Sequence, residues 1–403
     1  MPPTTSSQDP AAQPTLAGTA SAIAPLRGAL LVDRELRALC GTQIQAAPGA
    51  SAIGEQQIQA SSLDLRLGPI AHEIRAGFLP NAAPIEQRLA ELETARISLE
   101  GSGAVLQRGR VYLVPLEEEL ALEPGLRASF NPRSSTGRCD VFTRVLSASH
   151  PRFNETPPGH RGRLWIEIAP LSFPVRLARG DRLCQLRLSR GDPSLTREEL
   201  IDEYRRTPLC WRGEEPLAER EVRFSDDGGI ELHLGLQGRD PCGWRAKQGS
   251  AALQFAGESQ HDARDFWEPV HAHQGRSILE PGGFYIFASR ERVVIPPHLA
   301  AEMLPVDLGL GELRNNYAGF FDNGFGWRRA GEAGVRGTAA VLEVRAHDVP
   351  FLIEDGQVFF RLSYYRASGV PERIYAEGRA GNSYRDQDLS LARTFRSWQA
   401  PKP

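Results

Sequence analysis

Long apolar runs are absent from this sequence of 403 residues. A membrane-spanning helix needs roughly 18 or more consecutive apolar residues, and no segment approaches that length. Residues 1–25 are rich in Ala, Pro, Thr and Ser and lack the basic and then apolar order of a signal peptide. We therefore expect a cytoplasmic protein with no membrane partner and a disordered tail at residues 1–25.

Cysteine is scarce and scattered along the chain. The five cysteines form no C-x-x-C pair, so we expect neither a disulfide framework nor a structural zinc site. The signature of zinc-dependent deaminases, H-x-E followed by P-C-x-x-C, is also missing, and we expect no zinc-activated water. The cysteines are Cys40, Cys139, Cys184, Cys210 and Cys242.

Lysine is nearly absent, because Lys247 and Lys402 are the only two. Any anionic ligand must therefore be bound by arginine guanidinium groups, hydroxyls and backbone N–H groups. The sequence contains no run of basic residues and no basic helix, so we expect no nucleic-acid polymer as a partner.

Short apolar alternations separated by Gly and Pro dominate the chain from about residue 26 onward. Alternation with a period of two predicts β-strands, and the close spacing indicates an all-β sandwich or barrel. Two short helices are expected, one from an N-cap at Asp33 to Gly41 and one from Ser194 to about Arg206. The alternating runs include Leu63/Leu65/Leu67, Val111/Leu113, Leu164/Ile166/Ile168 and Leu183/Leu186/Leu188.

The second half of the chain repeats the first with slowly growing offsets, as insertions in loops produce. Trp165-Ile-Glu-Ile168 aligns with Val341-Leu-Glu-Val344, and Phe130-x-Pro132 aligns with Met303-x-Pro305. We therefore predict two tandem β domains, a helical linker and a tail. These segments are residues 26–190 and 223–368 for the domains, 191–222 for the linker and 369–403 for the tail.

Polar chemistry is concentrated in Arg133-Ser-Ser-Thr-Gly-Arg138, which the second half does not keep. Hydroxyls and backbone N–H groups at the end of a strand bind phosphate oxygens, and arginine adds charge-assisted hydrogen bonds. The segment therefore indicates a polyphosphate site in the first domain. An ordinary Ser/Gly turn with solvated arginines has the same composition and remains an alternative.

Glu167 lies inside the apolar run Leu164–Ile168, where alternation directs its side chain away from the core face and into a pocket. Burial raises the pKa of a carboxyl group, which suits a base that moves a proton. Glu343 occupies the same place in the second half, so an architectural role for this acidic position stays open.

Asp64 alternates with Leu63 and Leu65 and should lie opposite the core face beside Arg66. It suits either a Mg²⁺ ion on a nucleotide or an ion pair with Arg66. We favour the ion pair, because an acidic residue and a basic residue also occupy these two places in the second half.

Four motifs together resemble the deoxycytidine triphosphate (dCTP) deaminases, relatives of the trimeric deoxyuridine triphosphatases (dUTPases), and in particular a long form with a duplicated domain. The resemblance implies two dUTPase-like β-barrel domains of the β-clip type with few short helices. It also implies zinc-independent hydrolytic deamination of dCTP to dUTP and ammonia. The motifs are Gln59–Gly68, Arg133–Arg138, Gly162–Glu167 and Tyr384–Gln387.

The resemblance further implies roles for individual residues. Glu167 matches the catalytic glutamate, which activates the water that attacks C4 of cytosine. Ser134 and Arg138 match groups that orient the base and the water. The positions that match the substrate-binding residues are Arg133, Ser135, Thr136, Gly137, Trp165, Ile166, Gln387 and Tyr375.

Two family positions differ in this chain. The sugar-binding aspartate of the family falls on Pro157, where Asn154 or Glu155 is the nearest substitute. The phosphate-binding lysine of the tail falls near Ser383, which leaves one of two arginines for that role. These arginines are Arg385 and Arg379.

The two halves look complementary. The first keeps the Arg-Ser-Ser segment, and the second has lost that segment but is followed by the tail that contains Gln387. The second half retains Phe321-Asp-Asn-Gly-Phe-Gly326, which is similar to the Asp-x-Gly turn of the family. Active sites in this family form between neighbouring β domains, so we hypothesise that one chain supplies both walls of a pocket that the tail closes. We expect deletion of residues 375–403 to abolish turnover and to leave the protein folded.

Two other functions stay open. A bifunctional enzyme would also cleave dUTP to dUMP and pyrophosphate, which needs Mg²⁺ and an acid such as Asp64. A non-catalytic nucleotide sensor would bind without turnover. The resemblance implies Mg²⁺ carried with the triphosphate, thymidine triphosphate (dTTP) as a feedback inhibitor, and a homo-oligomer such as a trimer.

Overall fold

The computed structural model describes residues 27–80, 83–148, 150–305, 314–315, 319–329, 331–345, 348–375, 377, 384 and 387–398. The fold is mainly β, as the sequence predicts. Within the described residues, none of the helices has the length and apolar content to span a bilayer. The α-helices there are α1 (Asp33–Leu39), α2 (Ile85–Leu92), α3 (Ser134–Arg138) and α4 (Arg197–Arg206).

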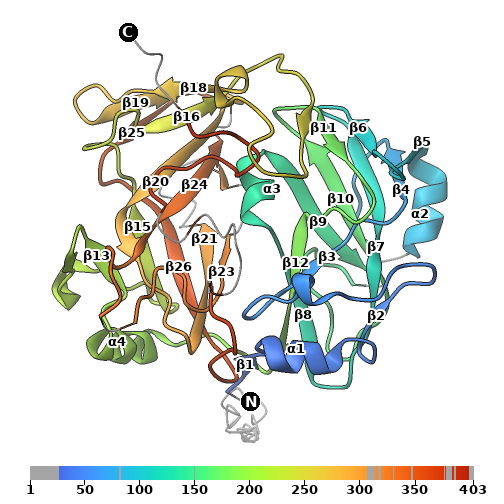
Figure 1. The fold of residues 1–403 in the computed structure, drawn as a ribbon, viewed down its shortest axis with the longest axis horizontal. Coiled ribbons are helices and arrows are strands. Elements are labelled where there is room, and N and C mark those ends of the chain that lie inside the picture. Colours follow the sequence, from blue (N-terminus) through green and yellow to red (C-terminus); the bar gives the residue numbers. More distant parts are fainter. Residues whose placement is uncertain are drawn as a thin grey trace, which may run out of the picture.

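The first half of the chain forms the strands on the right of Figure 1. One sheet has the order β5-β4-β7-β10-β9 with β2 on β7, and another has the order β1-β12-β3 with β8 on β12. Alternate apolar side chains of both sheets, such as Val114, Ile166 and Leu186, meet in one buried core. The strands are β1 (Ala29–Leu30), β2 (Ile44–Ala46), β3 (Leu63–Leu65), β4 (Ile70–Ile74), β5 (Glu93–Ser98), β6 (Ala104–Leu106), β7 (Val111–Ala121), β8 (Leu126–Pro132), β9 (Val141–Ser147), β10 (Arg161–Pro170), β11 (Val175–Leu177) and β12 (Cys184–Arg190).

The second half forms the strands on the left of Figure 1 around a core of its own, which includes Phe287, Leu342 and Tyr364. Its larger sheets have the orders β14-β13-β20-β16-β18, with β24 on β20 and β22 on β24, and β15-β26-β21-β23. The strands are β13 (Cys210–Arg212), β14 (Glu215–Pro216), β15 (Gly229–His233), β16 (Gly243–Ala246), β17 (Leu253–Gln254), β18 (Trp267–Val270), β19 (Arg276–Leu279), β20 (Phe284–Val293), β21 (Leu299–Pro305), β22 (Arg314–Asn315), β23 (Phe320–Phe321), β24 (Thr338–Arg345), β25 (Phe351–Glu354) and β26 (Val358–Arg366).

Corresponding strands pair in the same way in the two halves. β10 pairs antiparallel with β7, as β24 does with β20, and β12 pairs with β8, as β26 does with β21. Glu167 on β10 and Glu343 on β24 are therefore structural counterparts.

The two halves meet in a buried polar contact and a shared sheet. The Glu302 carboxylate on β21 accepts hydrogen bonds from Asn131 Nδ2 at 2.6 Å and Arg187 Nη2 at 3.2 Å, both in the first half. Strand β17 of the second half pairs in parallel with β11 of the first, with Val175 opposite Leu253. This joint fixes α3, which lies between the halves in Figure 1, against the second half.

The C-terminal segment is part of the larger apolar core, which contains residues of both halves. Ala392 and Phe395 are buried in that core, and the Phe395 ring packs against Phe266 and Trp267 at centroid distances of 5.4 and 5.8 Å. Deletion of residues 375–403 would remove these buried apolar groups, so the expectation that the truncated chain stays folded needs correction.

Both expected helices form, with shifted starts. Val32, not Asp33, is the N-cap of α1, and the Asp33 carboxylate accepts backbone N–H groups of Glu372 and Arg373 instead. The long-range contact thus replaces the local cap. α4 begins after Thr196, whose hydroxyl accepts the backbone N–H of Glu199 at 3.3 Å.

Candidate active site

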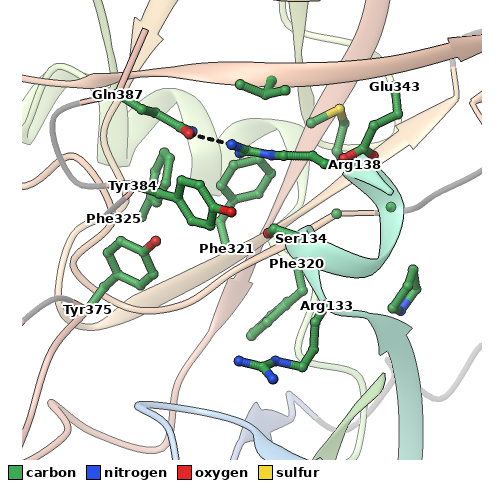
Figure 2. A pocket seen from close by; sticks show the side chains of 15 residues that line it. Arg133, Ser134, Arg138, Phe320, Phe321, Phe325, Glu343, Tyr375, Tyr384 and Gln387 are labelled. Atoms are coloured by element: carbon green, nitrogen blue, oxygen red, sulfur yellow. Dashed lines mark hydrogen bonds between the residues drawn. The ribbon is translucent and has the colours of Figure 1, made fainter. Parts of the chain in front are cut away.

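A cavity lies at the junction of the two halves, between α3 and β24, and Figure 2 shows it from close by. The first half contributes α3 and the residue before it, and the second half contributes β24 and a group of aromatic rings. It adjoins a wider groove of about 430 Å³. The cavity is lined by Pro132, Arg133, Ser134, Gly137, Arg138, Met303, Gly319, Phe320, Phe321, Phe325, Val341, Glu343, Tyr375, Tyr384 and Gln387.

Helix α3 and the residue before it present Arg133, Ser134, Gly137 and Arg138 to this cavity, and Ser135 lines the adjoining groove. Thr136 does not line it; its buried hydroxyl donates to the backbone oxygen of Leu183 at 2.7 Å and anchors α3 beside β12. Gly137 faces Glu343 so closely that a Cβ would lie 2.9 Å from the carboxyl group. A side chain at residue 137 would therefore displace the Glu343 carboxyl group from its place against α3.

Glu343 is the buried carboxyl group of the cavity. Burial raises its pKa from the ordinary value of 4.5 to about 8; the positive charge of Arg138 opposes this rise and the negative charge of Asp140 adds to it. A carboxyl group with this pKa exchanges its proton near neutral pH, which is what a general acid or base requires.

Arg138 joins α3 to the C-terminal segment. Its Nη1 donates to Gln387 Oε1 at 2.8 Å, the bond drawn in Figure 2, and to the backbone oxygen of Ser390 at 3.1 Å. Its guanidinium lies 4.0 Å from the centre of the Tyr384 ring. The predicted Arg138 and Gln387 are thus brought into direct contact, although 249 positions separate them.

Asp322 extends the site into the groove. It comes from the Phe321–Gly326 turn and accepts hydrogen bonds from the Ser61 backbone N–H at 3.0 Å and the Ser62 hydroxyl at 3.3 Å. Desolvation, together with the nearby charge of Asp64, raises its pKa to about 6. The groove is lined by Gln56, Gln59, Asp64, Arg133, Ser134, Ser135, Arg182, Gln185, Phe320, Asp322, Tyr375, Tyr384 and Arg393.

The structure does not bring Glu167 together with Ser134 and Arg138, contrary to the prediction. Glu167 Oε1 accepts hydrogen bonds from Arg144 Nη2 and Nε at 2.6 and 2.9 Å, and a Cβ at Gly77 would lie 2.4 Å from its other oxygen. Burial raises its pKa, as predicted, but the opposing charge is that of Arg144. In this chain the counterpart Glu343 faces α3.

The base-reading positions differ in the same way. Trp165 packs in a separate apolar cluster with Leu113 and Leu146, and Ile166 belongs to the core of the first half. Neither is among the residues that line the cavity, whereas Val341, the counterpart of Trp165, is. The wall expected from β10 is therefore supplied by β24.

Asp64 and Arg66 do not form the ion pair that the sequence favoured. Asp64 lies 3.3 Å from Arg133 Nε and 3.5 Å from Arg182 Nη1, in the groove. Arg66 Nε is 2.7 Å from Glu118, a buried carboxylate of β7. Neighbouring strands thus provide partners that local alternation cannot indicate.

The expected substitutes for a sugar-binding aspartate have structural contacts. Asn154 Oδ1 accepts the backbone N–H of Val145 at 2.8 Å, and Glu155 is 2.7 Å from Arg152 Nε. Neither residue is among those that line the cavity or the groove. Ser383, Arg379 and Arg385 lie outside the described residues.

The part of the chain that the structure describes contains no group of three or more His, Cys, Asp or Glu side chains that could hold a metal ion. Burial raises the pKa of the thiols of Cys139, Cys184 and Cys210, and they stay protonated at neutral pH.

Sequence reasoning did not assign Glu343, Asp322, the rings of Phe320 and Phe325, or Arg393 to the site, although it named Glu343 as the counterpart of Glu167. The Phe321–Gly326 turn was the available signal: following the second half from that turn to its next strand leads directly to Glu343. The turn and β24 thus belong to the same wall of the site.

Two β domains enclose a buried glutamate, an arginine and a serine in one cavity between the two halves of the chain. Residues 27–192 match the N-terminal domain, and residues 206–395 the C-terminal domain, of 2'-deoxycytidine 5'-triphosphate deaminase (DCD). A crystal structure of 2'-deoxycytidine 5'-triphosphate deaminase from Agrobacterium tumefaciens is similar, with 39% identity and a TM-score of 0.76 over 86% of this chain and 100% of that chain. The chain belongs to this deaminase family.

Curated relatives match a shorter stretch. The "dCTP deaminase, dUMP-forming" of Methanobrevibacter smithii is 32% identical over 33% of this chain and 66% of the relative, and the "dCTP deaminase" of Halorubrum lacusprofundi is 31% identical over 33% and 63%. The chain thus spans somewhat less than two thirds of the length of these relatives. The "dCTP deaminase, dUMP-forming" of Coprothermobacter proteolyticus is 32% identical over 33% of this chain and 69% of the relative.

Proposed function

We propose that this protein hydrolyses dCTP to dUTP and ammonia, with Glu343 as the base that activates water. The observation that carries the proposal is the single cavity that Glu343 lines together with Ser134 and Arg138. The substrate named for the family and its relatives supports dCTP as the nucleotide.

In the proposed reaction the water oxygen bonds to C4 of cytosine while Glu343 takes one water proton. The C4–N bond then breaks and the amine leaves as ammonia. One proton of the water ends on ring nitrogen N3 and the other on the departing amine, so atoms and charges balance. Ser134 and Arg138 orient the base and the water, and burial keeps the pKa of Glu343 in the range that suits both proton transfers.

We place the base, the sugar and the phosphates of the nucleotide according to the residues that line the cavity and the groove. The base lies along β24 at Val341, the sugar contacts the Asp322 carboxylate between Phe320 and Tyr375, and the phosphates lie by the arginines of the groove. Asp322 thereby takes the role that the sequence placed near Pro157. Mg²⁺ arrives with the triphosphate as part of the substrate.

The test follows ammonia, dUTP, dUMP and pyrophosphate by chromatography after incubation of the purified protein with dCTP and Mg²⁺. We expect ammonia and dUTP from the wild type, a loss of at least 100-fold in Glu343→Gln, and near wild-type rates in Glu167→Gln. The Glu167 variant is the matched control, because it removes the same charge from the counterpart strand. Activity that depends on Glu167 and not on Glu343 would overturn the assignment.

A bifunctional enzyme that also forms dUMP is the second candidate. Two of the three relatives described above are named dUMP-forming, and the buried Asp64 carboxylate lines the groove on the side where we place the phosphates. Appearance of dUMP and pyrophosphate, lost in Asp64→Asn while ammonia release continues, would support this candidate. Binding of dCTP without ammonia would instead indicate the nucleotide sensor.

The family resemblance supports further proposals about partners. We infer a cytoplasmic homo-oligomer, such as a trimer, that dTTP inhibits. Mass measurement in solution and inhibition of ammonia release by dTTP test these two points.

A further inference from the structure

The end of α3 is joined to β24 by an ion pair between the two halves of the chain. Asp140, which follows α3 after one residue, is fully buried, and its carboxylate accepts a hydrogen bond from Nη2 of Arg345. Arg345 lies two positions beyond Glu343 on β24, and side chains two positions apart on a strand point to the same face. The pair therefore connects the helix to the face of the strand that carries Glu343.

Asp140 is fixed in the first half by further contacts. The Ser172 hydroxyl donates to its carboxylate at 2.5 Å, and its backbone oxygen accepts the N–H of Leu171 at 3.0 Å. Its own N–H donates to the backbone oxygen of Gly137 at 2.8 Å. The carboxylate of Asp140 is thus a fixed point of the first half at the end of α3.

Arg345 is anchored in the second half by the other arm of its guanidinium. Its Nη1 donates to the backbone oxygen of Gly282, which precedes β20, and the guanidinium lies 5.6 Å from the centre of the Phe284 ring. The side chain is only 20% exposed. A guanidinium holds its two Nη donors in a rigid fork, so Arg345 binds its own half and Asp140 at the same time.

The separation of α3 and β24 decides where the groups of the cavity stand. Ser134 and Arg138 belong to α3, whereas Glu343 belongs to β24. In Figure 2 the Glu343 carboxyl group lies against α3. A shift of about 1 Å between helix and strand would change the distance from the base to the groups that orient the substrate. Misplacement on this scale can lower a rate roughly 100-fold.

We propose that Arg345 is a positioning residue of the active site, which fixes α3 against β24 through Asp140. The substrate-orienting groups of α3 are thereby held at a constant distance from Glu343. Arg345 is not among the described residues that line the cavity or the groove, so it acts through the wall of the site and not on the nucleotide. The inference rests on the proposed function, because that function makes Glu343 the base.

Steady-state kinetics of ammonia release from dCTP tests the positioning role in the full chain, at pH 9, where Glu343 is mostly ionised. We expect Arg345→Gln to lower kcat at least tenfold and to change KM less than threefold, because the nucleotide keeps its own contacts. Arg345→Lys keeps the charge without the planar fork and should retain part of kcat. Arg245→Gln is the matched control with a wild-type kcat, because Arg245 pairs with Glu280 inside the second half.

Thiol labelling gives a readout that does not depend on turnover. Cys139, between α3 and Asp140, is buried, and so are Cys184 on β12 and Cys210 on β13. Labelling by iodoacetamide, located by mass spectrometry, should rise at least tenfold at Cys139 in Arg345→Gln and stay at the wild-type level at the other two thiols. In a folded variant, equal rises at all three thiols would show a general loss of stability and would overturn the proposal.

Two further results would overturn the positioning role: a wild-type kcat in Arg345→Gln, or losses in Arg345→Gln and Asp140→Asn that add fully in the double variant. Two residues that act as one pair should lose little more together than the worse single variant loses. If Arg345→Gln does not fold, a wild-type kcat in both Arg345→Lys and Asp140→Asn would overturn the role. Labelling of Cys139 that rises as expected, in a protein whose wild type releases no ammonia from dCTP, would support the link between α3 and β24 and overturn the proposed function.

Discussion

Gly137 and Glu343 compete for one space at the junction of the halves, since a Cβ on residue 137 would stand 2.9 Å from the carboxyl atoms of residue 343. Gly137→Ala should therefore push the carboxyl group away from α3 and lower kcat by tenfold or more, because small misplacements of a reacting group are costly. Alanine also favours the helix by about 1 kcal/mol. Steady-state kinetics and thermal unfolding of the same sample test this: a wild-type kcat would contradict it.

The pH dependence of activity should report the Glu343 carboxyl group. With its pKa raised to about 8, the base is protonated below that value, so kcat/KM should rise about tenfold per pH unit and level off above pH 8. Asp140→Asn should move this limb to lower pH, because the charge of Asp140 raises the pKa of Glu343. Asparagine also tolerates the positive φ of 54° at this position. A limb that stays in place in Asp140→Asn would exclude Glu343 as its origin.

Stability should depend on pH with a definite sign. A carboxyl group whose pKa is raised by folding contributes its full stability below its ordinary value of 4.5, and that stability is lost as the pH rises through about 8. Glu343→Gln removes this group. Between pH 4.5 and 8 the free energy of unfolding should therefore fall more in the wild type than in the variant. Denaturant titrations at pH 5 and pH 8 measure the difference, and a constant difference would contradict the prediction.

The C-terminal segment contacts the cavity through Gln387 and the apolar core through Phe395, and two substitutions can separate these two roles. Gln387→Ala removes the 2.8 Å hydrogen bond to Arg138 and should lower activity about tenfold with a small change in the unfolding midpoint. Phe395→Ala empties a buried aromatic site and should destabilise the protein by about 3–5 kcal/mol as well. Equal loss of stability in both variants would show that Gln387 is mainly structural.

The sequence predicts local structure well where a short pattern determines it. The alternation around Leu63, Val111 and Ile166 predicts the strands that form, and the composition of Arg133–Arg138 predicts the segment that lines the cavity. Glu167 and Glu343 share the same local pattern, so no property of either strand shows which one faces α3. That choice depends on how the two halves are rotated relative to each other, which long-range contacts such as Asn131–Glu302 determine.

Long-range contacts also explain the mistaken partners. Arg66 was assigned to its sequence neighbour Asp64, but strand β7 places the Glu118 carboxylate closer. Asp33 has the residue type of an N-cap, yet it binds backbone N–H groups near residue 372 instead. In both cases the local interaction is worth little, so a tertiary contact of similar energy decides.

Ser134 and Glu343 reach one pocket from different halves of the same chain. Each wall of that pocket is therefore formed by its own stretch of the sequence. In an assembly of identical single domains, one substitution alters both sides of every interface at the same time. Here β24 can change while its counterpart β10 stays as it is. The two walls are therefore free to vary independently, and substrate preference can be altered on one side of the pocket alone.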